Sequence, residues 1–181
     1  AASDVYKRQI KEVKTNDYFK SNKVVLFALP GAFTPTCSAK HLPGYIKYYQ
    51  DIKDKGVDII ACMAVNDPHV MRAWGLANEV EGQIDMLSDS DCSVSQSLGL
   101  DMNFGRIMGH RSRRYAMIVD DNVIKKSFEE EVGAFEVSTA ENILKFGRTK
   151  EIESTMMSVK EIINFIPLNK NNIDNLELEN L

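Results

Sequence analysis

Cysteine is scarce in this 181-residue sequence, and its three positions, Cys37, Cys62 and Cys92, are widely spaced. An odd and scattered set does not form a disulfide framework, so we expect a reducing compartment, either the cytoplasm or an organelle matrix such as that of a mitochondrion or plastid. A Cys-x-x-Cys pair is missing, because Lys40 stands three positions after Cys37, and this excludes dithiol exchange through that motif. No spacing of histidine and cysteine suits zinc, and we expect neither a metal nor an organic cofactor.

Long apolar runs and an excess of one charge are also absent. No run approaches the roughly 20 residues that a membrane-spanning helix needs. The 22 Lys and Arg and 26 Asp and Glu residues leave a formal net charge of −4, so neither nucleic acid nor an anionic membrane is an expected partner. Repeats are absent too. We expect one domain over residues 10–147, with a tail at 1–9 and a poorly ordered polar extension at 148–181.

What the sequence does contain is an alternation of short apolar runs with helical periodicity. Three runs predict buried strands: 24–29, 58–65 and 84–87. Four helices are expected, over 37–55, 68–78, 92–98 and 138–146. The last begins at a capping box formed by Ser138 and Glu141, and Asp121 and Asn122 predict a tight hairpin between two further strands. This order predicts the α/β class, a three-layer sandwich with a mixed central sheet and helices on both faces.

The segment 99–109 shows neither periodicity, and we expect an irregular loop there that exposes Leu100, Met102, Phe104 and Met108. Together with Phe33, these side chains form a candidate apolar patch. An exposed patch of this kind favours a protein partner. The alternative is that the side chains pack beneath the loop.

The most informative stretch is 30–38, Pro-Gly-Ala-Phe-Thr-Pro-Thr-Cys-Ser, between the first strand and the helix. It places Cys37 in the first turn of that helix, where unpaired backbone amides and the helix dipole favour a thiolate over a thiol. Thr34 offers a hydroxyl to the thiolate or to a bound oxygen, and Pro30 can shield the sulfur from water. The alternative, a buried core cysteine, suits a position inside an apolar run better than one among Thr, Pro and Ser.

This stretch, followed by His-Leu-Pro-Gly at 41–44, resembles the peroxiredoxin family, and within it the type II or class five branch. The segments 65–67 and 114–117 match the same branch, and the resemblance covers roughly residues 22–146. It implies a thioredoxin-like fold. It also implies a thiol peroxidase that reduces hydrogen peroxide and alkyl hydroperoxides through a cysteine sulfenic acid.

The resemblance also implies roles for individual residues. Cys37 matches the nucleophile that attacks the peroxide, and Thr34 matches the hydroxyl that binds both thiolate and peroxide. Pro30 matches the shielding proline, and Arg114 matches the arginine on the first strand of the later hairpin. Backbone amides around Thr36 and Cys37 bind the peroxide oxygen in the family. A fixed guanidinium and amide donors are what the departing oxygen needs, although by residue type alone an exposed strand arginine is the alternative for Arg114.

Three neighbouring residues have less defined roles. Phe33 and His41 are candidate contacts to the substrate. His41 follows Cys37 by one helical turn and can add positive character to the thiolate, the alternative being a histidine on the helix surface or at an interface. Alternation along the strand points Arg113 away from Arg114, and we interpret Arg113 as a surface charge.

The sequence departs from the family at the second cysteine. Some members carry a resolving cysteine in the loop after the hairpin, where Val137 stands here. Cys62 matches the second cysteine of plant-like members, 25 positions after the first, but it lies in an apolar run, and we interpret it as a core residue. Cys92 has no family counterpart, and we interpret it as a helix-start residue, with a regulatory thiol as the alternative. We therefore predict a one-cysteine cycle, with glutathione, glutaredoxin or thioredoxin as the external reductant.

Members of this class pair through the active-site face, which implies a homodimer. A non-enzymatic alternative keeps the fold and transmits oxidation of Cys37 to a partner, as a redox-sensing module. The joint presence of Pro30, Thr34, Cys37 and Arg114 speaks against a mere scaffold. A cysteine hydrolase would need a histidine base beside Cys37, and His41 is poorly directed for that role.

Overall fold

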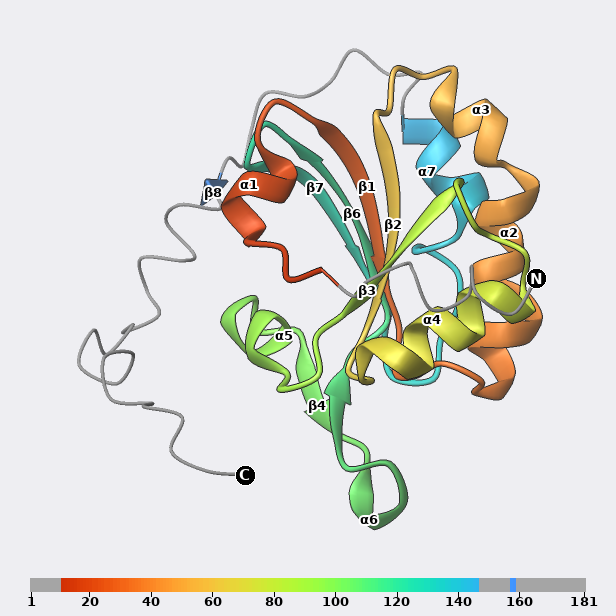
Figure 1. Ribbon diagram of the computed structural model, residues 1–181, viewed down its shortest axis with the longest axis vertical. Coiled ribbons are helices and arrows are strands. Elements are labelled where there is room, and N and C mark those ends of the chain that lie inside the picture. Colours follow the sequence, from red (N-terminus) through yellow and green to blue (C-terminus); the bar gives the residue numbers. More distant parts are fainter. Residues whose placement is uncertain (1–10, 147–156, 159–181) are drawn as a thin grey trace.

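Six strands form one mixed sheet, and helices lie against both of its faces (Figure 1). This computed structural model describes residues 11–146 and 157–158 of the chain. Along the sheet the strand order is β3-β2-β1-β6-β7-β8. The strand bounds are Lys23–Ala28 for β1, Ile59–Ala64 for β2, Ile84–Ser88 for β3, Tyr115–Asp120 for β6, Val123–Glu129 for β7 and Met157–Ser158 for β8. The expected α/β sandwich with a mixed sheet is confirmed, while the expected tail at 1–9 and most of the extension at 148–181 lie outside the described residues.

Strand β1 occupies the middle of the sheet because its side chains are apolar on both faces. It pairs in parallel with β2 and antiparallel with β6, so that Phe27 lies opposite Cys62 on one side and Ala116 on the other. Successive side chains of a strand point to opposite faces. Phe27 therefore joins the core on one face, and Leu26 joins the core on the other.

Each face of the sheet has its own apolar core and its own helices. The helix bounds are Thr15–Phe19 for α1, Leu42–Lys47 for α2, Tyr49–Lys53 for α3, Pro68–Ala77 for α4, Ser93–Ser97 for α5, Gly105–Met108 for α6 and Ala140–Phe146 for α7. Helices α2, α3, α4 and α7 cover the face of Phe27, on the right in Figure 1. Helices α1 and α5 lie on the left, over the face of Leu26. The three-layer arrangement is thus confirmed.

The single helix expected over 37–55 is wrong, because the segment is broken into three pieces. It begins as a π-helical turn, Cys37–His41, in which the amide of Leu42 donates to the carbonyl of Cys37. Pro43 has no backbone N–H, so the regular α-helical bond to residue 39 cannot form, and the chain passes through a wider turn. A second break lies at Tyr48, whose φ of −100° and ψ of 16° separate α2 from α3.

The segment expected to be an irregular loop is a small hairpin. Strands β4, Asp101–Asn103, and β5, His110–Ser112, pair antiparallel, and α6 joins them at the tip that projects downward in Figure 1. Leu100 is buried at 5% exposure and packs in the core with Phe19 and Met117, so its expected exposure is wrong. The exposed apolar side chain of this segment is Ile107, at 99%.

Two motifs predicted from local sequence, a hairpin turn and a helix cap, have different outcomes in the structure. Asp121 and Asn122 have φ of 45° and 65°, the left-handed values of a two-residue hairpin turn between β6 and β7, and this prediction is confirmed. The capping box at Ser138 is wrong: the amide of Asn142 donates to Thr139 Oγ1 at 3.2 Å, so Thr139 caps α7. Ser138 instead donates its amide and its hydroxyl to Glu130 Oε1, each at 2.8 Å.

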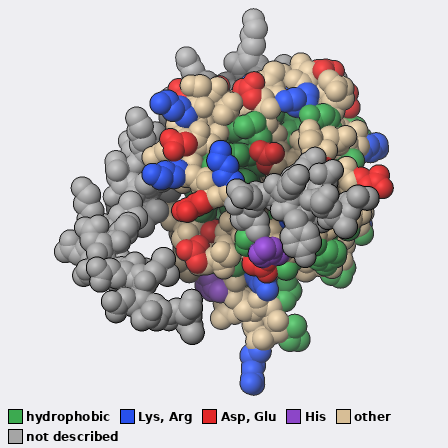
Figure 2. Space-filling model, in the orientation of Figure 1, with side chains coloured by type: hydrophobic (Ala, Val, Ile, Leu, Met, Phe, Trp, Pro, Cys, Tyr) green, Lys and Arg blue, Asp and Glu red, His purple; other side chains and the backbone are tan. Residues whose placement is uncertain are grey.

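The surface carries both signs of charge. Figure 2 shows acidic and basic side chains interspersed over one face of the molecule, without a patch of a single sign. Among the described helices, none combines the length and the apolar character that crossing a membrane requires.

Candidate active site

The loop between β1 and Cys37 is held by short polar contacts. The amide of Ala32 donates to Asn66 Oδ1 at 2.9 Å, which ties the loop to the end of β2. The Thr34 hydroxyl, expected to donate to the thiolate or a bound oxygen, donates instead to the carbonyl of Gly31 at 2.8 Å. A side chain at Gly31 would place its Cβ 3.3 Å from Thr34 Cγ2, so the backbone approaches its neighbours more closely here than most residues allow.

Cys37 lies at the point where this loop becomes helical. Thr36 directly precedes the first turn, and Cys37 is 1% exposed. The guanidinium of Arg114 donates from Nη2 to Cys37 Sγ at 3.4 Å, across 77 positions of sequence. The amide of Ser38 donates to the carbonyl of Thr34 at 3.0 Å, so the loop and the helix start form one continuous turn. A helix start and a fixed cation therefore meet at one sulfur, and both stabilise a thiolate.

His41 lies within hydrogen-bond distance of the other terminal nitrogen of the same guanidinium. Arg114 Nη1 lies 2.9 Å from His41 Nδ1, and His41 Nε2 lies 3.2 Å from the carbonyl oxygen of Ser138. A guanidinium can only donate, so Nδ1 is the acceptor. A carbonyl can only accept, so Nε2 carries the proton. Both contacts are satisfied by one neutral tautomer.

The environment keeps His41 uncharged. Burial, at 1% exposure, and the adjacent guanidinium of Arg114 lower the pKa of His41 from 6.5 to about 3. The expectation that His41 adds positive character to the thiolate is therefore wrong. The sequence placed His41 correctly one turn after Cys37, but its charge depends on burial and on a partner 73 positions away.

Glu130 is a site residue that the sequence analysis missed. It follows β7, is 4% exposed, and accepts at Oε1 from the amides of Glu136 and Ser138 and from the Ser138 hydroxyl, each at 2.8 Å. Its own amide donates to the carbonyl of Arg114 at 3.0 Å. One buried carboxylate thus fixes the loop that approaches His41. A glutamate directly after a strand carries no sequence signal for this role.

Arg113 and Arg114 line the same small hollow, of about 150 Å³, together with Pro30, Thr36 and Glu130. The prediction that Arg113 points away from Arg114 is wrong, whereas its charge does lie in a partly exposed ion pair, with Nη1 3.9 Å from Glu129 Oε2. Arg113 is half-buried and donates from Nη2 to the carbonyl of Glu130 at 3.0 Å. Both arginines precede Tyr115, where β6 begins, so the alternation of a strand does not yet apply to them.

Aromatic rings border the site on two sides. Phe33 is 59% exposed, and its ring centroid lies 6.4 Å from that of Trp74. Phe135, which the sequence analysis did not single out, packs its ring 5.1 Å from His41, with the guanidinium carbon of Arg114 5.6 Å from its centroid. The Phe135 ring therefore contacts both His41 and the guanidinium of Arg114.

The other two cysteines lie away from solvent and from each other. Cys62 is fully buried in the same apolar core as Cys37, and burial raises the pKa of its thiol well above 9. Cys92 precedes α5 on the opposite face of the sheet, and burial together with the nearby carboxylate of Asp89 raises the pKa of its thiol. All three thiols are free.

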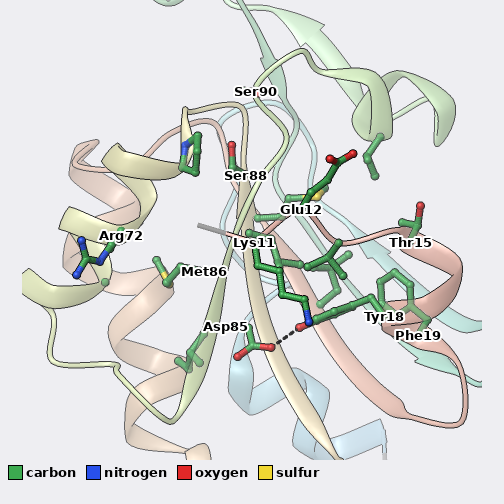
Figure 3. Close-up of a pocket in the computed structure, with 18 of the residues that line it drawn as sticks. Lys11, Glu12, Thr15, Tyr18, Phe19, Arg72, Asp85, Met86, Ser88 and Ser90 are labelled. Atoms are coloured by element: carbon green, nitrogen blue, oxygen red, sulfur yellow. Dashed lines mark hydrogen bonds between the residues drawn. The ribbon is translucent and has the colours of Figure 1, made fainter. Parts of the chain in front are cut away.

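Within the described residues, no three His, Cys, Asp or Glu side chains converge in a way that could hold a metal ion. A larger hollow, of about 1210 Å³, runs along β3, and none of the side chains around Cys37 lines it. Figure 3 shows its rim, where the hydroxyl of Tyr18 donates to Asp85 Oδ2 at 2.7 Å.

Comparisons with known proteins agree with this geometry. A family model described as Redoxin matches residues 3–144. The chloroplastic Peroxiredoxin-2E-2 of Oryza sativa subsp. japonica is 46% identical over 144 residues, which cover 76% of this chain and 63% of that relative. The chain thus spans less than two thirds of the rice protein, whereas it covers 85% of Peroxiredoxin-2B of Arabidopsis thaliana, at 41% identity and with 76% of this chain matched.

The fold comparison gives the same result. The crystal structure of reduced Prx3 in complex with hydrogen peroxide, from Vibrio vulnificus, superimposes with a TM-score of 0.76 at 48% identity. The match covers 78% of this chain and 89% of that one. The thioredoxin-like arrangement that the motif at 30–38 implied is thereby confirmed.

Proposed function

The chain belongs to the peroxiredoxin family, and from this premise we propose that it is a thiol-dependent peroxidase acting on hydrogen peroxide and alkyl hydroperoxides. The observation that carries the proposal is the 3.4 Å contact between Arg114 Nη2 and Cys37 Sγ at a helix start. A cysteine that only fills space in the core needs no guanidinium beside its sulfur. A thiolate nucleophile does, because the cation stabilises the negative charge that it brings to the reaction.

The proposed chemistry needs one covalent step at Cys37. The thiolate attacks one peroxide oxygen, the S–O bond forms as the O–O bond breaks, and the other oxygen leaves with the bonding electron pair. That oxygen takes up a proton and departs as water or as an alcohol, and Cys37 becomes a sulfenic acid. In this proposal Arg114, which donates to the sulfur, and the backbone amides at 36 and 37 are the donors to the developing charge. Pro30 and Thr36 line the small hollow beside Arg114.

We propose that an external thiol completes the cycle. Cys62 is fully buried behind the site, and the segment 131–137, where Val137 stands, holds no cysteine. A thiol of glutathione, glutaredoxin or thioredoxin would attack the Cys37 sulfenic acid, release water and form a mixed disulfide. A second thiol would then release Cys37 as the thiolate. One equivalent of peroxide followed by disulfide mapping tests this, and a stoichiometric Cys37–Cys62 bond would overturn it.

The peroxidase proposal is tested by the rate at which peroxide oxidises Cys37. The chain has a single tryptophan, Trp74, whose Nε1 donates to Ser38 Oγ at 3.1 Å, so we expect its fluorescence to change when the adjacent Cys37 is oxidised. Cys37→Ser should abolish both the signal and turnover. Arg114→Gln should slow oxidation by roughly 100- to 1000-fold, as the loss of a single oxyanion donor does, and Arg114→Lys should fall between that variant and the wild type. A wild-type rate equal to that of free cysteine would refute the proposal.

A redox-sensing module of the same fold is the second candidate. The 1% exposure of Cys37 favours it, because a reductant must reach the sulfur for turnover to be efficient. Steady-state assays with glutathione and glutaredoxin, and separately with thioredoxin, distinguish the two functions. Fast oxidation of Cys37 without reduction by any of these thiols would indicate a sensor.

Two properties of the whole protein are also proposals. The exposed Phe33 and Ile107, at 59% and 99%, support a homodimer, which light scattering would test. The three free thiols support a reducing compartment, cytoplasmic or in an organelle matrix, which localisation of a tagged chain would test.

A further inference from the structure

We propose that His41 is a positioning residue for the peroxidase reaction: as a neutral acceptor it orients the Arg114 guanidinium on Cys37 without neutralising its charge. This inference rests on the function proposed above and assigns a role to a buried side chain that the chemistry itself does not use. Three features of the site carry it: the partners of Arg114, the tautomer of His41, and the anchoring of Ser138.

The first feature is the division of the guanidinium between two acceptors. Within the described part of the chain, the hydrogen bonds of Arg114's side chain go to His41 Nδ1, at 2.9 Å, and to Cys37 Sγ, at 3.4 Å. Its guanidinium carbon lies over the ring of Phe135, 5.6 Å from the centroid. Because a guanidinium is planar and its donors are rigidly spaced, fixing Nη1 at His41 also fixes the direction of Nη2. The contact to the sulfur is therefore set by His41.

The second feature is the absence of a negative charge at this position. A carboxylate would orient the guanidinium equally well, but it would offset the positive charge that the thiolate and the departing oxygen need. His41 provides a lone pair and no charge. Its proton lies on Nε2, which donates a hydrogen bond to the Ser138 carbonyl. Nδ1 therefore remains free of a proton and accepts a hydrogen bond from Arg114. The other tautomer would bring a donor against a donor at Arg114 and an acceptor against an acceptor at Ser138.

The third feature is that the residue whose carbonyl fixes this tautomer, Ser138, is itself held by further hydrogen bonds. Ser138 O also accepts from the hydroxyl of Tyr45 at 2.8 Å, and the Ser138 amide and hydroxyl are both held by buried Glu130. The positioning chain thus runs from Glu130 through Ser138 and His41 to Arg114, and it ends at the sulfur. A chain of this kind transmits geometry, since every member has its partners in place.

The test compares two variants of nearly the same shape. In His41→Asn the side-chain oxygen can take the place of Nδ1 as a neutral acceptor, while Tyr45 still satisfies the Ser138 carbonyl. In His41→Asp the same position carries a negative charge. We expect the second-order rate of Cys37 oxidation by hydrogen peroxide to stay within a few-fold of wild type in His41→Asn. It should fall about 10- to 100-fold in His41→Asp, by analogy with the range found when the partner that orients a metal ligand is altered. His69→Asn, at an exposed histidine of α4, is the control for loss of an imidazole.

Two more measurements separate positioning from a structural role. The pH at which the rate is half-maximal should move upward in His41→Asp and stay in place in His41→Asn. A carboxylate beside Arg114 weakens the effect of the guanidinium charge on the thiolate, whereas a neutral amide does not. In an Arg114→Gln background, His41→Leu, which removes the acceptor and adds no charge, should cause no further slowing, since a positioning role acts only through Arg114. Equal rates for the Asn and Asp variants, or additive losses with Arg114→Gln, would overturn the proposal. If either variant fails to fold, as thermal unfolding will report, the comparison moves to His41→Gln against His41→Glu.

Failure of the proposed function remains distinguishable from failure of this inference. Alkylation of Cys37 by iodoacetamide depends on the thiolate but on no peroxide. If wild-type Cys37 does not react rapidly with peroxide, the peroxidase proposal fails, while the alkylation rates of His41→Asn and His41→Asp still test the positioning role. If wild type reacts rapidly and the two variants match in both assays, only the role of His41 is refuted.

Discussion

The buried neutral histidine should make the fold sensitive to mild acid, and the size of the effect follows from its surroundings. Burial and Arg114 lower the pKa of His41 from 6.5 to about 3 in the folded chain. In the unfolded chain the imidazole is solvated and takes up a proton near pH 6.5. Between these two values the unfolded state binds more protons, so the free energy of unfolding decreases as the pH falls. Above 6.5 neither state is protonated and stability is unaffected.

The expected loss is about 2 kcal/mol at about pH 5, because each pH unit below the unfolded pKa costs close to 1.4 kcal/mol until the folded pKa is reached. This figure changes little if the folded pKa is anywhere below about 4, since folded His41 is then unprotonated at pH 5. The perturbation that isolates it is His41→Asn, which removes the titrating group and keeps an acceptor for Arg114.

The assay is urea unfolding at about pH 7.5 and about pH 5, followed by the fluorescence of Trp74, which is 1% exposed in the folded chain. We compare the free energy of unfolding of wild type with that of His41→Asn at each pH. The advantage of wild type should be smaller by about 2 kcal/mol at pH 5 than at pH 7.5, because only wild type loses stability by protonation of this histidine. His69→Asn is the control for the loss of an exposed imidazole. If the difference between wild type and His41→Asn does not change with pH, His41 is not held neutral and the reasoning is refuted.

Other predictions concern stability and the third cysteine. Phe27→Ala should lower the free energy of unfolding by about 3–5 kcal/mol, because the fully buried ring stacks on Tyr45 with centroids 3.9 Å apart. The matched control is Ile107→Ala, at a side chain that is 99% exposed. It should change the free energy of unfolding by less than about 0.5 kcal/mol in the same denaturation assay. Asp67→Ala should cost about 1 kcal/mol, since its carboxylate accepts from two amides at the start of α4, and a change in the urea midpoint without a change in slope would show it. Cys92→Ser should leave the peroxidase rate near that of wild type, because α5 lies across the sheet from Cys37; a loss of ten-fold or more, with the fold intact by circular dichroism, would contradict this assignment.

Several elements could be predicted from short stretches of sequence, because the forces that form them act within a few residues. The apolar runs at 24–29 and 58–65 form adjacent parallel strands. Asp67 and Pro68 start α4, where the carboxylate caps and the proline occupies the first turn. Asp121 and Asn122 adopt the left-handed backbone that a two-residue hairpin requires.

Other elements could not be predicted because a distant partner decides them. The small hairpin of β4 and β5 has short polar strands without clear alternation, and it forms where Leu100 is drawn into the core beneath it. Ser138 fits the pattern of a helix cap, yet buried Glu130 binds its amide and hydroxyl, and Thr139 takes the capping position. The break at Pro43 was visible in the sequence, and its missing N–H was the signal that could have found it.

The sequence by itself determined that Cys37 lies where a buried strand gives way to a helix, since apolar periodicity and the Pro-Gly turn are local features. The resemblance of the motif added Arg114 to the site. Only the tertiary structure decided what His41 is: the same imidazole on a helix surface would titrate near neutral pH. Its neutrality, its tautomer and its hold on Arg114 come from residues 73 and 97 positions away, which are brought together by folding. Electrostatic character depends on burial and on the partners in space, and neither is encoded in the neighbouring residues of the chain.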